Sequence, residues 1–195
     1  MVLEQMTARQ ALERLLEGNR RMAAGGASVP YDTELAHRLE REGQHPIATV
    51  ICCSDSRVPP ELLFGCGLGE LFVVRAAGNV LDHFEMGSVE YGVTDLHTPL
   101  VMVLGHSGCG AVAAAMEGDA PGYLGELLGE IAPSVEEAGR LAHDRTEQTR
   151  LAEDLNIRRS VARLRADPAL SGLPGVEILG AKYDLHSGLV SVLED

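Results

Sequence analysis

Two stretches of similar design stand out in the chain, Ile47-Ala-Thr-Val-Ile-Cys-Cys53-Ser-Asp55-Ser-Arg57 and Leu100-Val-Met-Val-Leu-Gly-His106-Ser-Gly-Cys109. Each begins as an apolar run typical of a buried strand and is followed by a helical pattern. Apolar runs that alternate with helices predict a parallel sheet covered on both faces. Open α/β sheets bind ligands at the carboxyl ends of their strands. We therefore expect Cys53, His106 and Cys109 to lie together at that rim.

These three residues form a donor set that suits zinc. Two sulfurs and one imidazole nitrogen leave the fourth tetrahedral position open to water or substrate, as in catalytic zinc sites. Cysteine binds zinc as the thiolate, so the site has to favour that form. Cys109 is expected in the first turn of a helix, whose dipole favours an anion, with Ser107 as the N-cap. The sequence therefore predicts a catalytic zinc centre.

A carboxylate and a guanidinium accompany the predicted ligands. Asp55 and Arg57 stand two residues apart in the loop that follows Cys53. An aspartate beside a metal either ligates it or accepts a proton from metal-bound water. A bidentate pair with Arg57 would keep the carboxylate ionised and away from the metal. The alternative is a salt bridge that only stabilises the loop.

Composition limits the class of protein and its partners. The chain has 195 residues, of which 45% are hydrophobic and 23% charged, and this suits one globular domain without a membrane-spanning run. A net charge of −13 argues against nucleic-acid and anionic-membrane partners, which need a basic face. Residues 1–5 lack the basic start and apolar run of a secretory signal, and four cysteines do not resemble a disulfide framework. We expect a cytoplasmic protein whose cysteines bind metal or catalyse.

The organisation along the chain is predicted as one domain, 1–195, with three parts. Residues 1–45 form a helical arm with helices over 3–24 and 33–40, which pack on a sheet or on a partner subunit. Residues 46–116 form the zinc-binding α/β core. Residues 117–195 hold helices, divided by Pro133, and a closing hairpin made by 176–183 and 189–193.

Both metal-binding motifs resemble the signature of the β-class carbonic anhydrases. The likeness continues along nearly the whole chain, through four further segments: Leu15-Leu-Glu-Gly-Asn19-Arg, Leu71-Phe-Val-Val-Arg75-Ala-Ala-Gly78-Asn79, Gly87-Ser-Val-Glu90-Tyr91 and Gly180-Ala-Lys-Tyr183-Asp184. Two departures are Ala76, where the family often has Asn, and the turn 66–70, which lacks the usual Pro-Gly pair. Neither removes a catalytic group.

The resemblance assigns roles to particular residues. It implies one Zn²⁺ per chain on Cys53, His106 and Cys109, with Asp55 and Arg57 as the catalytic dyad beside it. Three further residues would bind substrate: Gln44, matching the plant-like branch in which a glutamine amide binds CO₂ or bicarbonate, and Phe72 and Tyr91, matching aromatic residues of the apolar CO₂ pocket. In the family this pocket forms at a dimer interface. From the residues alone, the aromatic side chains suit the core and the glutamine a solvated loop.

The implied fold is α/β, with a central sheet of about four parallel strands plus an edge strand, flanked by helices and carrying N-terminal helical arms. The implied function is the reversible hydration of CO₂ to bicarbonate and a proton by zinc-bound hydroxide, in a homodimer or higher homo-oligomer. Two alternatives remain: hydrolysis of a CO₂ analogue, COS or CS₂, on the same zinc, and a non-catalytic zinc scaffold. Gln44 favours an open site, with water rather than Asp55 as the fourth ligand.

Overall fold

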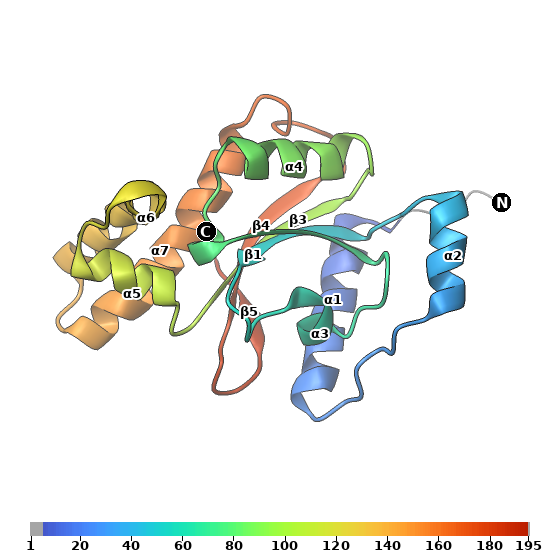
Figure 1. The fold of residues 1–195 in the computed structure, drawn as a ribbon, viewed down its shortest axis with the longest axis horizontal. Helices are drawn as coiled ribbons and strands as arrows, with labels where there is room; N and C mark the ends of the chain where they lie inside the picture. Colours follow the sequence, from blue (N-terminus) through green and yellow to red (C-terminus); the bar gives the residue numbers. More distant parts are fainter. Residues whose placement is uncertain (1–5, 195) are drawn as a thin grey trace.

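The computed structural model describes residues 6–194 and is built on a five-stranded sheet of order β2-β1-β3-β4-β5 (Figure 1). Four strands are parallel, namely β1 (Ala48–Cys53), β2 (Leu71–Ala76), β3 (Leu100–His106) and β4 (Glu177–Tyr183). The short β5 (Val190–Val192) closes an antiparallel hairpin with β4 at one edge. The predicted class, a mostly parallel α/β sheet with an added edge strand, is confirmed.

The sheet, with β1 and β3 at its centre, divides the core into two layers. β1 and β3 are buried along their whole length, and successive side chains point to opposite faces. Val50 and Cys52 pack on the face covered by α1 (Ala8–Ala23) and α3 (Pro60–Phe64). Ile51 packs on the other face, which α4 (His83–Thr94) and α7 (Arg145–Ala166) cover (Figure 1). This two-sided burial explains why the strands are continuous apolar runs in the sequence.

The two N-terminal helices differ in how they pack. α1 starts at a capping box made by Thr7 and Gln10, and its Ala11 and Leu15 are fully buried under the sheet. α2 (Thr33–Glu42) has no buried residue and lies at the side of the molecule (Figure 1). The first residues of the predicted helix, 3–5, and the start of the chain lie outside the described residues. None of the helices within 6–194 has the length and apolar character that a membrane crossing requires.

Three helices, α5 (Gly110–Glu117), α6 (Gly122–Leu141) and α7, pack together beyond the carboxyl ends of the strands (Figure 1). The prediction that Pro133 divides this region is wrong, because α6 runs through it. Proline costs the helix one backbone hydrogen bond. Leu128 and Ile131, buried on the same helix, hold it in place by packing, which outweighs that local loss. The chain instead breaks at residues 142–144, before α7.

The strand order creates a switch point. The chain passes from β1 to β2 on one side and later places β3 on the other side of β1. The loops that leave the carboxyl ends of β1 and β3 therefore diverge and leave a crevice between them, where open α/β sheets bind ligands. Cys53 is the last residue of β1 and His106 the last of β3. The topology thus places both at this crevice.

Candidate metal centre

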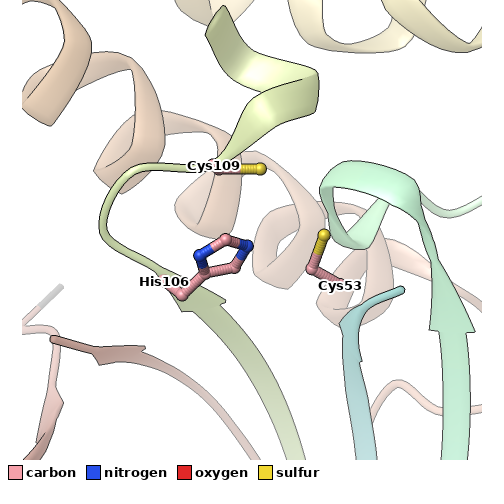
Figure 2. Close-up of side chains that lie close together, drawn as sticks. All are labelled: Cys53, His106 and Cys109. Atoms are coloured by element: carbon pink, nitrogen blue, oxygen red, sulfur yellow. The ribbon is translucent and has the colours of Figure 1, made fainter. Parts of the chain in front are cut away.

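The structure brings the three predicted ligands together. Cys53 and His106 end adjacent parallel strands, and Cys109 stands at the N-cap of α5. Their ligand atoms all lie within 4.8 Å of one another, and each residue is at most 4% exposed. Figure 2 shows both sulfurs and the imidazole ring converging on one point. This arrangement suits a single ion bound by two sulfurs and one nitrogen.

The imidazole of His106 is oriented for metal binding. Its Nδ1 lies 3.0 Å from the carbonyl oxygen of Ser107, to which it donates its proton. That contact leaves Nε2 with a lone pair, and Nε2 is buried without a hydrogen-bond partner. Burial lowers the pKa of His106, but the neighbouring Cys53 sulfur and the Ser107 carbonyl raise it on balance. A backbone acceptor that fixes the other ring nitrogen is the usual support of a metal-binding histidine.

The two sulfurs are arranged to carry negative charge. Cys53 Sγ accepts the N–H groups of Gly78, at 3.2 Å, and of Asp55, at 3.4 Å. Without metal, the Cys109 thiol donates to Cys53, which lowers the pKa of Cys53 to about 4 and raises that of Cys109. The buried sulfur pair thus shares one proton in the absence of metal. A divalent cation that binds both sulfurs as thiolates would release this proton.

Cys109 itself occupies the N-cap of α5, so the prediction that Ser107 does so is wrong. The backbone N–H groups of Ala111 and Val112, in the first turn, act to lower the pKa of the Cys109 thiol. Ser107 Oγ instead accepts the N–H of Leu185 at 2.9 Å, which ties the loop to the β4–β5 turn. The helix terminus therefore acts on the ligand directly.

Asp55 and Arg57 form the bidentate pair that the sequence suggests. Arg57 Nε and Nη2 donate to the two carboxylate oxygens at 2.9 and 2.7 Å, and the Arg57 backbone N–H adds a third bond at 2.9 Å. These bonds hold the pKa of the Asp55 carboxyl well below its usual range. Asp55 Oδ2 lies 3.9 Å from His106 Nε2, at the edge of the metal-binding group and outside it.

Arg75 is a supporting residue that the sequence pattern does not single out. From β2 it donates to the carbonyl oxygen of Cys53 at 3.0 and 3.1 Å and to that of Asp55 at 2.8 Å. The loop that carries a ligand and the carboxylate is thereby fixed to the neighbouring strand. An arginine at the carboxyl end of a strand is a weak signal for this role, because such residues are common.

The three predicted substrate-binding residues lie elsewhere on this chain. Gln44 is exposed in the loop before β1, at the opposite end of the strand from Cys53. Phe72 pairs in register with Thr49, roughly 13 Å along β1 from Cys53. Tyr91 of α4, 47% exposed, contacts Phe72 with the ring centroids 5.9 Å apart and the ring planes tilted by 49°. One chain therefore supplies the metal ligands and the Asp55–Arg57 pair in one place and these three residues in another.

Comparison with known proteins identifies the family. The carbonic anhydrase family model matches residues 48–190. Carbonic anhydrase 2 of Mycobacterium tuberculosis is 39% identical over 95% of this chain and 92% of its own, and carbonic anhydrase of Mycolicibacterium smegmatis is 36% identical over 93% and 91%. The Coccomyxa β-carbonic anhydrase structure, in complex with acetazolamide, is 28% identical, covers 93% of this chain and 86% of its own, and superposes with a TM-score of 0.71.

A second solved structure, the β-carbonic anhydrase CafA of Aspergillus fumigatus, is 28% identical with a TM-score of 0.73, covering 83% of this chain and 86% of its own. The fold and the Cys-His-Cys centre define a metalloenzyme of the α/β class, and the chain belongs to the β-carbonic anhydrase family. Zinc is the metal of that family, and Cys53, His106 and Cys109 are the residues here that fit it.

Cys52 and Cys66, which are not in the metal-binding group, allow a test of which thiols bind metal and which are buried and unreactive. Burial raises the pKa of Cys52 and Cys66 to about 12, so both stay protonated and unreactive at about pH 7. We expect iodoacetamide to modify Cys53 of the folded protein only after a chelator has removed the metal, and to spare Cys52 and Cys66 throughout. Fragment mass spectra distinguish Cys52 from Cys53.

Unfolded protein is the positive control for this labelling, since all four cysteines should then react. Modification of Cys52 or Cys66 in the folded, metal-free chain would contradict their burial. Modification of Cys53 in the zinc-loaded chain would contradict its role as a ligand.

Proposed function

We propose that this chain catalyses the reversible hydration of CO₂ to bicarbonate and a proton, the function of its family, with Asp55 and Arg57 as catalytic residues. The observation that carries this assignment is the Asp55–Arg57 pair, which sits beside the metal-binding group without joining it. Zinc bound there would lower the pKa of a bound water toward neutrality and so supply hydroxide at neutral pH. Three protein ligands leave the position for that water.

Asp55 supplies an oriented acceptor at the open side of the centre. Its carboxylate is ionised because Arg57 holds the pKa low, and only 16% of its side chain is exposed. With zinc bound, the carboxylate would accept a hydrogen bond from the reacting water and so orient it toward CO₂. Arg57 also donates to the Gly108 carbonyl at 3.2 Å, which fixes the pair against the second ligand loop. This geometry supports an open site.

Gln44, Phe72 and Tyr91 complete the pocket from a second chain in this proposal. The tilted Phe72–Tyr91 pair offers an apolar surface to CO₂, and the Gln44 amide offers a donor to the charge that develops on the CO₂ oxygens. Because Gln44 and Tyr91 are exposed and all three residues lie away from the metal centre of their own chain, a homodimer is the smallest assembly that joins them to it. Higher homo-oligomers satisfy the same requirement. Four free cysteines support placement in the reducing cytoplasm.

The alternatives use the same centre. A hydrolase of COS or CS₂ would need the same zinc and the same acceptor, so it differs in pocket shape alone. A scaffold would need the three ligands without the acceptor. Arg57 orients the Asp55 carboxylate, and neither residue belongs to the metal-binding group. A zinc scaffold does not need this pair, so its presence favours an enzyme over a scaffold.

Stopped-flow CO₂ hydration with a pH indicator, at about pH 8 on protein of known zinc content, tests the proposal. We expect turnover in proportion to bound zinc, lost on chelation and restored by added zinc. COS and CS₂ hydrolysis measured on the same sample should be much slower. Fast COS or CS₂ hydrolysis without CO₂ turnover would favour the analogue hydrolase, and zinc-loaded protein inactive on all three would favour the scaffold.

A further inference from the structure

Helix α7 carries a stripe of buried polar side chains that the proposed mechanism does not use. Glu153, Asn156 and Ser160 are 4, 4 and 8% exposed, and they lie on one side of the helix among apolar neighbours. α7 crosses the face of the sheet and reaches the region beyond its carboxyl ends (Figure 1). A buried carboxylate and a buried amide destabilise a fold unless hydrogen bonds satisfy them.

Glu153 is bound to the backbone of a metal ligand. Its Oε1 accepts the N–H of Cys109 at 3.2 Å, and its Oε2 pairs with Lys182 Nζ of β4 at 2.8 Å. Lys182 also contacts Asp154 at 2.7 Å. The carboxylate therefore holds the residue that begins α5, while its charge is neutralised from the opposite side. Nothing else among the described contacts accepts the Cys109 N–H.

Asn156 is connected to the other cysteine ligand through one residue, Gly78. Its Nδ2 donates to the carbonyl oxygen of Gly78 at 2.7 Å, and the Gly78 N–H donates to Cys53 Sγ at 3.2 Å. Gly78 has φ of 67°, and a Cβ there would lie 2.7 Å from Ile131 Cδ1. Ser160 Oγ donates to the backbone carbonyl of Asn156, one turn earlier on the helix, at 3.1 Å. The hydrogen bond from Asn156 of α7 to the Gly78 carbonyl thus fixes the residue whose N–H binds Cys53 Sγ.

We propose that Glu153 and Asn156 are positioning residues for the metal centre: from one face of α7 they fix both cysteine ligands, and they thereby set how tightly zinc is held. The inference rests on the proposed zinc site but not on the identity of the substrate. Residues that hydrogen-bond to metal ligands typically contribute about 10–100-fold to metal affinity or activity. The two residues differ in chemistry, since Glu153 has to accept a hydrogen bond and Asn156 has to donate one.

That difference defines the variants. Glu153→Ala removes the acceptor, whereas Glu153→Gln keeps a carbonyl oxygen for the Cys109 N–H. Asn156→Asp preserves size but replaces the donor with a carboxylate that faces the Gly78 carbonyl. Asp154→Ala is the matched control, because it removes a carboxylate from Lys182 without touching either ligand loop.

The readout is zinc affinity, measured on purified full-length protein by competition with a chromogenic chelator, together with the sulfur-to-metal absorption of the Co²⁺-substituted protein. We expect zinc affinity to fall about 10–100-fold in Glu153→Ala and Asn156→Asp, with shifted Co²⁺ bands, and to stay within a few-fold in Glu153→Gln and Asp154→Ala. If Glu153→Ala does not fold, the isosteric Asn156→Asp, checked by circular dichroism, decides the outcome.

Three results would overturn the inference. One is unchanged zinc affinity and Co²⁺ absorption in Glu153→Ala and Asn156→Asp. Another is an equal loss in Asp154→Ala, because the effect would then run through general stability. A wild-type chain that binds no zinc would remove the metal site itself, and this outcome is distinct from a zinc-binding chain without CO₂ turnover, which affects the proposed function alone.

Discussion

Replacing Asp55 with alanine is expected to lower the rate of CO₂ hydration by about 10²–10⁴-fold, the range in which a positioned proton acceptor contributes. Zinc content should not change, because Asp55 lies outside the metal-binding group. Stopped-flow rates and metal analysis of the same preparation measure both quantities. The variant therefore separates catalysis from metal binding, which the loss of Cys53, His106 or Cys109 would not.

Glu126→Ala on the exposed face of α6 is a suitable control, since it removes one exposed carboxylate that belongs neither to the metal-binding group nor to the Asp55–Arg57 pair. Its turnover should equal that of the wild type. Full activity in Asp55→Ala would contradict the role given to the carboxylate, and loss of zinc in that variant would show that Asp55 supports the metal instead.

A second large effect is expected from dimers that combine two inactive chains. Gln44→Ala removes a donor to developing charge, and loss of one such donor costs about 10²–10³-fold in rate. In a twofold dimer of one Asp55→Ala chain and one Gln44→Ala chain, one site carries both defects and the other carries neither. Such hybrids, purified by two different affinity tags, should recover about half of the wild-type activity.

The result depends on Gln44 serving the metal centre of its partner, as its place at the far end of β1 suggests. Hybrids of Asp55→Ala with Arg57→Ala are the negative control, because both residues act in the same centre and neither site would be intact. If Asp55–Gln44 hybrids stay as inactive as their parents, Gln44 does not act across the dimer.

The metal centre was predictable because its information is local. An apolar run followed at once by Cys53, and a second one ended by His106, identify two strand ends, and the rule for open sheets places them at one rim. The helix start at Cys109 was placed correctly to within two residues, but its cap was not. Cys109 and Ser107 compete for that position, and the tertiary contact of Ser107 with Leu185 decides the outcome.

The supporting residues were not predictable, because their role arises from tertiary packing. Glu153 is buried and Glu136 is exposed, yet both are acidic residues in helical patterns. No sequence pattern distinguishes the two glutamates. The difference arises only when α7 packs against the sheet and Lys182 pairs with the Glu153 carboxylate. Pro133 is the opposite case: its local preference to end a helix is strong, but the packing of α6 outweighs it and the helix continues. In the proposed dimer, the position of Gln44, Phe72 and Tyr91 relative to the metal depends on an interface between chains, which a single sequence pattern does not encode.

The hydrogen bonds from α7 also bear on the order of events when the chain folds. Glu153 is 44 residues from Cys109, and Asn156 is 78 residues from Gly78. Contacts between residues so distant in sequence form slowly, after the loops between them have closed. During synthesis, Cys53, His106 and Cys109 are made before α7. We therefore expect the zinc-binding shape to form late in folding, and we expect a reducing environment with available zinc to favour maturation by protecting the four thiols until then.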